Sequence, residues 1–129
     1  MVTRPRILLA DDHMEMRESI VQLLQSEFEM LEPVKNGFAL LEAAAKLEPD
    51  VCLLDISMPI INGIEVASRL RRRSAKCKVV FLTIHDDIDF VKAALATGAL
   101  GYVVKPRMAS DLKKAIREAL AGRVFISPR

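Results

Sequence analysis

The chain has 129 residues and a mass of 14.4 kDa, enough for one domain and too little for two independent cores. Apolar residues make up 51% and charged residues 28%, a balance that excludes a disordered, collagen-like or repetitive chain. No apolar run approaches the ~18 residues that cross a bilayer, and residues 1–6 lack the apolar stretch of a signal peptide. We therefore predict a single domain over residues 1–129 that is cytoplasmic and makes no contact with a membrane.

Short apolar runs predict the strands of a sheet. Four of them cover residues 7–10, 51–54, 79–82 and 102–104. Their near-continuous apolar character, without polar alternation, is typical of strands buried on both faces of a parallel sheet. A fifth strand is predicted over residues 29–34. It contains Pro33, which cannot donate a ladder hydrogen bond, so we expect this strand at an edge.

Apolar residues recur at helical spacing between these runs. The positions that share a helix face are Met16, Ile20, Leu23 and Leu24; Leu40, Leu41, Ala44 and Leu47; Ile64, Ala67 and Leu70; Ile88, Val91 and Leu95; and Leu112, Ala115, Ile116, Ala119 and Leu120. Ser110 is predicted to cap the start of the last helix, and Gly98 and Gly122 to follow the ends of the last two. Five strands alternating with five helices predict an α/β three-layer sandwich with a parallel sheet.

Polar side chains stand where the predicted strands end. Asp11 and Asp12 follow the first strand, Asp55 the third, Thr83 the fourth and Lys105 the fifth. Sites in open parallel sheets gather at the carboxyl ends of the strands, and three carboxylates meeting there repel one another unless a cation lies among them. Because no cysteine or paired histidine accompanies these oxygen ligands, we expect Mg²⁺ or Mn²⁺ rather than zinc.

The order and placement of these residues resemble the receiver domain of response regulators in two-component signalling. The matching motifs are Asp11-Asp12, Asp55-Ile56-Ser57-Met58-Pro59 with Gly63, Leu82-Thr83 and Lys105-Pro106. The similarity extends over residues 6–127. It implies a flavodoxin-like fold with strand order 2-1-3-4-5, which places the strand with Pro33 at an edge and those before Asp11 and Asp55 side by side.

The resemblance implies a role for each carboxylate. Asp55 would be the nucleophile that accepts a phosphoryl group from the phosphohistidine of a sensor histidine kinase or a phosphotransfer protein. Asp12, Asp55 and the backbone carbonyl of Ser57 would hold Mg²⁺ directly, and Asp11 through water. The domain would catalyse only its own phosphorylation and dephosphorylation, so we do not expect an enzyme.

Further roles implied by the resemblance concern the response to phosphorylation. Lys105 would bring a positive charge, and Thr83 a hydroxyl donor, to the phosphoryl oxygens. In the family the movement of this hydroxyl is coupled to an aromatic side chain that turns inward, and Tyr102 occupies that position. Ser57 and His85 occupy positions that tune how water reaches the phosphoryl group.

Each residue has a simpler interpretation when it is taken alone. Asp11 and Asp12 suit a helix N-cap, Thr83 suits a strand, Lys105 suits a surface, and Tyr102 suits an ordinary core. The functional interpretation is favoured because the residues occur together, in order, at successive strand ends.

The resemblance narrows to the NarL/FixJ subclass, whose receivers usually precede a helix-turn-helix DNA-binding domain. The segments that carry it are Asp11-Asp12-His13 and residues 82–87 and 122–128. We therefore expect transcription regulation. Residues 122–129 would start a linker to an output domain, and only that domain would contact DNA. Homodimer formation is one expected outcome of phosphorylation. A single-domain phosphorelay or adaptor protein is the alternative. The family also implies a cis peptide bond between Lys105 and Pro106, although proline is less usual there in this subclass.

Two other functions are disfavoured. A haloacid-dehalogenase-type phosphatase needs a second aspartate two residues after its nucleophile, where this chain has Ser57. A nucleic-acid module could use the basic half of the chain, because residues 1–65 hold 5 basic and 12 acidic side chains whereas residues 66–129 hold 14 and 5. However, the run Arg71 to Arg73 suits the solvated end of a helix, and aromatic residues make up only 5%.

The remaining candidates for metal or redox chemistry match no known spacing. Cys52 and Cys77 fit neither a zinc motif nor a disulfide-rich scaffold, so we predict reduced packing residues. His13 and His85 are too far apart in sequence for a metal-ligand motif.

Overall fold

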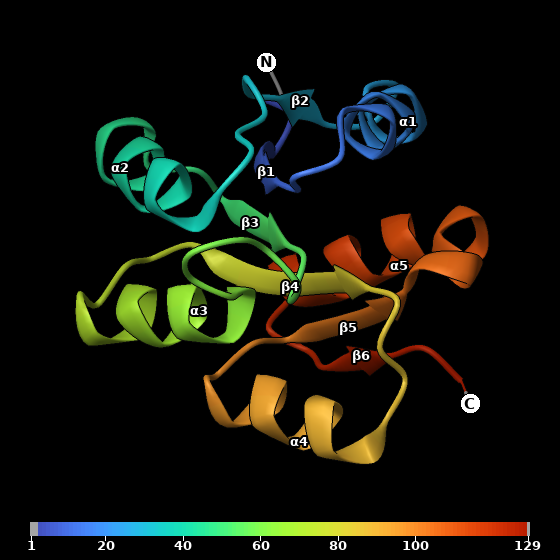
Figure 1. The fold of residues 1–129 in the computed structure, drawn as a ribbon. Coiled ribbons are helices and arrows are strands. Elements are labelled where there is room, and N and C mark those ends of the chain that lie inside the picture. The colour runs from blue at the N-terminus through green and yellow to red at the C-terminus, as the bar shows by residue number, and fades with distance from the viewer. Residues whose placement is uncertain (1–2, 129) are drawn as a thin grey trace.

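A parallel sheet forms the centre of the computed structural model, which describes residues 3–128 (Figure 1). In this part of the chain the strands are β1 (Arg6–Ala10), β2 (Glu29–Met30), β3 (Val51–Leu54), β4 (Lys78–Thr83), β5 (Gly101–Val104) and β6 (Phe125–Ile126). They lie in the order β2-β1-β3-β4-β5-β6, and every neighbouring pair is parallel. The predicted order 2-1-3-4-5 is confirmed, with one strand added at the β5 edge.

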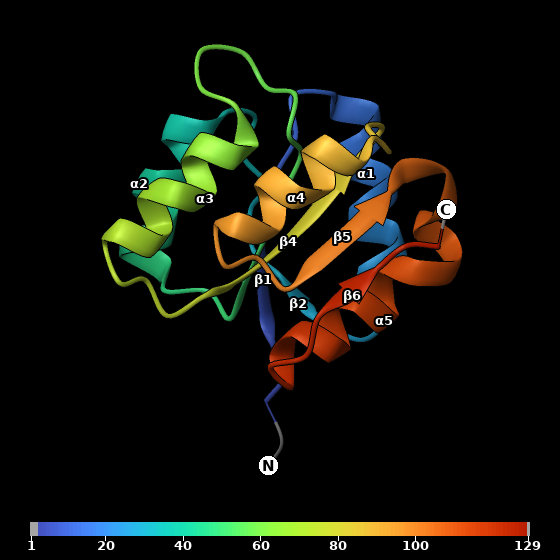
Figure 2. The same cartoon turned by 90° about the horizontal axis from the view of Figure 1, so that it is seen from below.

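Helices cover both faces of the sheet, as predicted. They are α1 (Met14–Leu24), α2 (Gly37–Leu47), α3 (Gly63–Arg72), α4 (Ile88–Ala96) and α5 (Met108–Leu120). The helices α2, α3 and α4 pack on one face, and α1 and α5 on the other (Figure 2). Along β1, Ile7 and Leu9 face α1 and α5, whereas Leu8 faces α2 and α3. Because both faces are buried, the strand sequences are continuously apolar.

The added strand lies in the segment predicted to begin a linker. The backbone N–H of Phe125 donates to Leu100 at 2.8 Å, and that of Ser127 donates to Tyr102 at the same distance. The Ser127 hydroxyl also donates to the Asp111 carboxylate at 2.8 Å. The expectation of five strands is therefore corrected to six for residues 3–128, and β5 is an inner strand. A strand of two residues is too short for its apolar pattern to be distinctive.

The strand with Pro33 lies at an edge, as predicted, although regular pairing covers only Glu29–Met30. Past this pair, the N–H groups of Leu31 and Val34 still donate to β1, to Ile7 and Leu9, at 2.9 Å each. Pro33 has no N–H to offer, so the ladder is interrupted there.

Several predicted details at helix ends are decided by the structure. Gly98 and Gly122 follow α4 and α5 with φ values of +90° and +79°, as expected of residues that end helices. The predicted N-cap at Ser110 is wrong, because a 3₁₀ turn over Lys105–Arg107 runs directly into α5 and leaves Ser110 inside the helix. The expected cis bond before Pro106 is also wrong, since every peptide bond in residues 3–128 is trans. A trans proline fits the first turn of a helix, which is where Pro106 lies.

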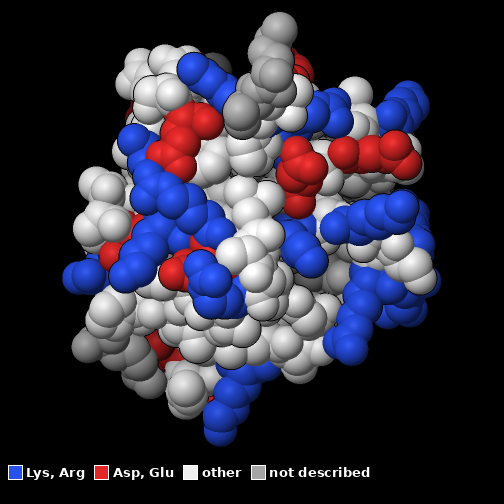
Figure 3. Space-filling model, turned by 180° about the vertical axis from the view of Figure 1, so that it is seen from behind, with Lys and Arg blue, Asp and Glu red and all other residues white. Residues whose placement is uncertain are grey.

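Basic side chains lie among acidic ones on the face drawn in Figure 3. Arg71 and Arg72 lie in the last turn of α3, as predicted for a helix end. Other basic residues pair with acidic ones, for example Arg117 with Glu27 and Arg123 with Glu118. Figure 3 shows Lys and Arg side chains over much of one face, with acidic ones interspersed. Among residues 3–128 no helix has the length and apolar character needed to cross a membrane.

Gly63 starts α3 against the backbone of Asp55, and this close approach generates a stability prediction. A Cβ at position 63 would lie 2.1 Å from the Asp55 carbonyl oxygen. We expect Gly63→Ala to lower the free energy of unfolding by at least about 2 kcal/mol, measured by urea denaturation. Gly122→Ala is the control, because only its positive φ opposes a side chain and we expect a loss of about 1 kcal/mol. Equal losses in the two variants would contradict the steric argument.

Candidate functional site

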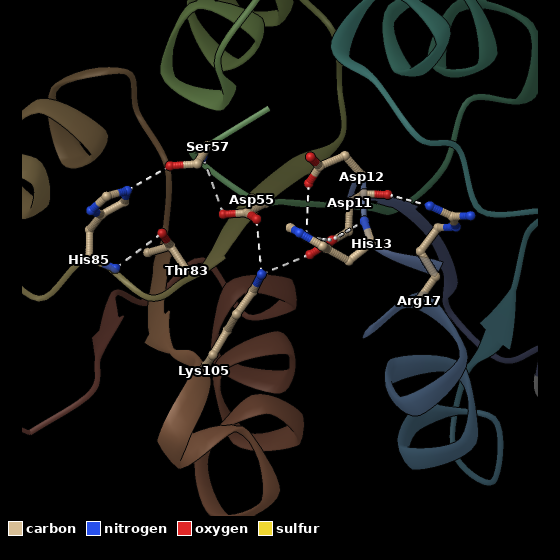
Figure 4. Close-up of polar contacts among 9 residues, drawn as sticks. All are labelled: Asp11, Asp12, His13, Arg17, Asp55, Ser57, Thr83, His85 and Lys105. Carbon is tan, nitrogen blue, oxygen red and sulfur yellow. Dashed lines mark hydrogen bonds and ion pairs between the residues drawn. The ribbon is translucent and has the colours of Figure 1, made fainter. Parts of the chain in front are cut away.

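Three strand ends bring Asp11, Asp55 and Lys105 into contact (Figure 4). The Lys105 Nζ lies 2.9 Å from Asp55 Oδ2 and 3.0 Å from Asp11 Oδ2. The two carboxylate side chains are 4% and 2% exposed, and that of Lys105 is 10% exposed. β1 and β3 are neighbours in the sheet, which places their carboxyl ends side by side. The site is therefore a buried ammonium shared by two buried carboxylates.

The protonation of Lys105 follows from this geometry. Burial alone would lower the pKa of its ammonium, but hydrogen bonds to Asp55 and Asp11 outweigh burial and the pKa is raised. The other oxygen of Asp55, Oδ1, accepts a hydrogen bond from the backbone N–H of Ser57 at 3.3 Å. Both oxygens of the central carboxylate are thus held in place before any ligand binds.

Asp12 and His13 form the exposed side of the site. The His13 Nδ1 lies 3.1 Å from Asp12 Oδ1 and 3.5 Å from Asp11 Oδ1. One ligand atom each from Asp11, Asp12 and His13 falls within 4.8 Å of the others, close enough to surround a metal ion. No role in the site was predicted for His13, although it directly follows Asp12 in the sequence.

The carboxylates do not cap α1. The residue that precedes this helix is His13, whose side chain makes no capping hydrogen bond. Instead, Asp11 Oδ1 accepts from the His13 backbone N–H at 2.9 Å, and the Asp11 carbonyl accepts from Arg17 at 2.8 Å. Arg17 holds the end of β1 from within α1, and no sequence motif marked it.

The donor set suits a hard divalent cation. Asp11, Asp12 and Asp55 offer carboxylate oxygens, the ligands that Mg²⁺ prefers. Three carboxylates face the single positive charge of Lys105, so the pocket keeps an excess of negative charge when all four groups are ionised. The residues present therefore fit the Mg²⁺ or Mn²⁺ expected from the sequence.

A second group of contacts converges on His85, just beyond β4. Its ring Nε2 lies 2.6 Å from the Ser57 hydroxyl, and its backbone N–H donates to the Thr83 hydroxyl oxygen at 3.3 Å. The Tyr102 hydroxyl donates to the His85 carbonyl at 2.7 Å, and the His85 ring stacks on Phe90 with centroids 4.3 Å apart. His85 therefore connects three of the predicted site residues with one another.

Tyr102 points inward in this structure. The residue is 1% exposed, and burial, followed by the negative charges of Asp86, Asp87 and Asp55, raises the pKa of its hydroxyl to about 12. The phenol is therefore protonated at neutral pH and able to donate its hydrogen bond.

This arrangement is that of a known family. Residues 7–117 match the family model of the response regulator receiver domain, so the chain belongs to that family. The family typically uses Mg²⁺, which agrees with the acidic cluster described above.

Individual relatives point to regulators of the NarL type. The chain is 37% identical over 126 residues to the transcriptional regulatory protein DegU of Brevibacillus brevis, and 36% identical over 123 residues to the nitrate/nitrite response regulator NarL of Escherichia coli. These matches cover 96% and 94% of this chain but only 53% and 57% of the relatives. The chain thus spans little more than half the length of these curated relatives.

Solved structures agree with this assignment. The receiver domain of NarL from Mycobacterium tuberculosis is 31% identical, with a TM-score of 0.90 and coverage of 95% of this chain and 100% of that one. A LuxR-family two-component response regulator from Aurantimonas sp. is 28% identical, with a TM-score of 0.92 and coverage of 98% and 91%. The predicted resemblance to response-regulator receivers is therefore confirmed.

The buried Lys105 generates a prediction about stability and metal. Lys105→Met leaves Asp11 and Asp55 facing each other without a shared cation, so we expect the free energy of unfolding at neutral pH to fall by about 3–5 kcal/mol. Mg²⁺ should restore part of this loss, because it supplies positive charge to the same carboxylates. Denaturant titrations with and without Mg²⁺ measure both effects.

Lys92→Met is the matched control, since Lys92 is an exposed lysine on α4. It should change stability by no more than about 0.5 kcal/mol. A similar loss in both variants would show that Lys105 does not hold the carboxylates together.

Proposed function

We propose that this chain is a phosphorylation-dependent switch in which Asp55 accepts a phosphoryl group from a phosphohistidine. The donor is a sensor histidine kinase or a phosphotransfer protein. The observation that carries the proposal is the buried Asp55 carboxylate at the end of β3, held by Lys105 beside a second buried carboxylate, Asp11. A charged carboxylate at this depth is costly unless a cation pairs with it, and Lys105 supplies that cation.

The transfer needs little from the protein beyond positioning and charge. A carboxylate oxygen of Asp55 forms a bond to phosphorus while the bond from phosphorus to the imidazole nitrogen breaks, and the electron pair of that bond returns to the imidazole. The Lys105 ammonium is placed to move from the carboxylate to the phosphoryl oxygens. Mg²⁺, held by Asp11, Asp12, Asp55 and the Ser57 carbonyl, would neutralise the negative charge on those oxygens.

The switch runs through the backbone of His85. When Thr83 turns its hydroxyl toward the phosphoryl group, its contact with the His85 N–H changes, and the same peptide segment carries the carbonyl that Tyr102 binds. A new charge near Thr83 therefore biases the position of Tyr102. The surface formed by α4, β5 and α5 responds, although β6 covers the edge of β5 at Gly101 and Tyr102. The free energy available is the difference between the phosphorylated and free pockets.

The output we propose is transcription regulation. DegU is named a transcriptional regulatory protein and NarL a nitrate/nitrite response regulator, and this chain covers about half of each. We infer a cytoplasmic protein in which residues 122–129, the segment that contains β6, begin the connection to an output domain, through which DNA is contacted. Homodimer formation upon phosphorylation would use the surface of α4, β5 and α5.

Phosphorylation by a small donor tests the proposed function. The chain, incubated with Mg²⁺ and acetyl phosphate, should gain one phosphoryl group that is stable in acid and labile in base, detected by intact-mass analysis. Asp55→Asn should gain none, because an amide is not a nucleophile of this kind. An adduct of equal yield in Asp55→Asn would place the acceptor elsewhere.

Asp12→Ala separates metal binding from the nucleophile. This exposed carboxylate should be removable without unfolding the protein, and its loss should weaken Mg²⁺ affinity measured by calorimetric titration. An unchanged titration would remove Asp12 from the set of metal ligands.

The contact between the Ser57 hydroxyl and the His85 ring, called the bridge below, generates a prediction about the lifetime of the phosphorylated form. The two side chains meet at 2.6 Å beside Asp55 and restrict access to it. We expect His85→Ala to shorten the lifetime of the phosphorylated form several-fold, because water then reaches the phosphoryl group more easily. The decay of the adduct after removal of acetyl phosphate measures this effect.

Phe90→Leu serves as its companion, since Phe90 stacks on the ring of His85 and its phenyl group cannot hydrogen-bond with Ser57. It should change the lifetime less than His85→Ala does. If His85→Ala leaves the decay rate unchanged, the bridge has no part in hydrolysis.

A further inference from the structure

Cys52 and Cys77 form a pair of free thiols in contact with each other. Their sulfur atoms lie 3.4 Å apart. Cys52 lies within β3 opposite Val79 of β4, and Cys77 is two residues before Val79, so both side chains point to the same face of the sheet. The prediction of reduced cysteines with a packing role did not include this contact, because a register between strands was needed to see it.

The two thiols differ in environment. Cys52 is fully buried, whereas Cys77 is partly exposed and lines a groove of about 700 Å³ together with Arg71, Lys76 and Lys78. Peroxide-sized molecules can therefore approach Cys77, but they reach Cys52 only through it.

The hydrogen bond between the thiols moves their two pKa values apart. The Cys52 thiol donates to the Cys77 sulfur. This bond lowers the pKa of Cys77 against the opposing effect of burial, and the same bond together with burial raises the pKa of Cys52 well above its usual value. Of the two thiols, Cys77 is therefore the one that loses its proton more readily.

We propose that Cys77 and Cys52 are a peroxide-oxidisable dithiol, with Cys77 as the attacking residue and Cys52 as the resolving residue. The Cys77 thiolate attacks one oxygen of hydrogen peroxide, the O–O bond breaks, and hydroxide leaves, which gives a sulfenic acid. The Cys52 sulfur then attacks the Cys77 sulfur, and the S–O bond breaks. The Cys52 proton and the departing hydroxyl form one water, and the hydroxide from the first step takes up the proton that Cys77 had lost on ionising to form the second, so one peroxide is reduced to two waters for each disulfide made.

The geometry allows the bond with little movement. The sulfur atoms must approach from 3.4 Å to the ~2.05 Å of a disulfide, a change within reach of side-chain rotation. The bond would tie β3 to the start of β4. Asp55 follows the other end of β3, so the oxidation site lies apart from the phosphorylation site and does not depend on the function proposed above.

Mass spectrometry of the full chain tests this proposal. Reduced protein is treated with hydrogen peroxide under native conditions, quenched, denatured and alkylated with N-ethylmaleimide. Untreated protein should carry two maleimides. Treated protein should remain monomeric, carry none, and have lost two hydrogens through the internal disulfide.

Two variants identify the roles of the thiols. Cys52→Ala should stop at the sulfenic acid on Cys77, which dimedone traps. Cys77→Ser should retain an alkylatable Cys52 that oxidises at least about tenfold more slowly than the wild-type pair. Asp55→Asn should oxidise at the wild-type rate, which separates this proposal from the phosphorylation chemistry.

Each contrary result is decisive. Two maleimides on treated wild-type protein, disulfides formed only between chains, or wild-type loss of the Cys52 thiol in Cys77→Ser would overturn the proposal. The wild-type measurement needs no substitution, so it stands even if a variant is unstable. Thermal melting of each variant shows whether its result comes from folded protein.

Discussion

The ion pair network of Lys105 with Asp11 and Asp55 is the interaction on which the site depends. Two carboxylates less than one-twentieth exposed would repel each other at the adjoining ends of β1 and β3. One ammonium, delivered from the end of β5, offsets that repulsion and keeps its proton because of it. The same three groups thus stabilise the resting fold and hold a nucleophile beside a cation. A phosphoryl group or a metal ion entering the pocket must compete with contacts that are already formed.

The register of the sheet fixes the relative positions of the side chains that make these contacts. Each inner strand is buried on both faces, and a slip by one residue would exchange the side chains that face α1 and α5 with those that face α2, α3 and α4. Asp11 and Asp55 follow Ala10 and Leu54, which are partners in the register of β1 and β3. The two carboxylates are therefore brought level by the same apolar packing that holds the core. Gly63 adds a further constraint, because α3 can start against Asp55 only where a side chain is missing.

The parts of the structure that could be predicted from sequence are those marked by several consecutive apolar residues or by polar residues that recur in order along the chain. Continuous apolar runs marked the inner strands, and polar residues directly after them marked the site, because strand ends in a parallel sheet share one edge. Local signals were weaker. Ser110 resembled a cap, but the turn before it was already helical, and the two residues of β6 carried no pattern of their own. The contact of Arg17 with the Asp11 carbonyl depends on the packing of α1, and that of Cys52 with Cys77 on the register of β3 and β4, neither of which any spacing in the sequence expresses.

His85 connects several of the predicted site residues with one another. Its ring meets Ser57 of the β3–α3 loop, its N–H meets Thr83 of β4, and its carbonyl meets Tyr102 of β5. These three contacts use different atoms of the same residue, so a displacement at any one of them is transmitted to the other two. The stacked Phe90 joins the assembly to α4. Access to Asp55 and the position of Tyr102 are therefore coupled through His85. A substitution of His85 should alter the lifetime of a modified Asp55 and the response of the α4 surface together, whereas Tyr102→Phe removes only the contact with the His85 carbonyl.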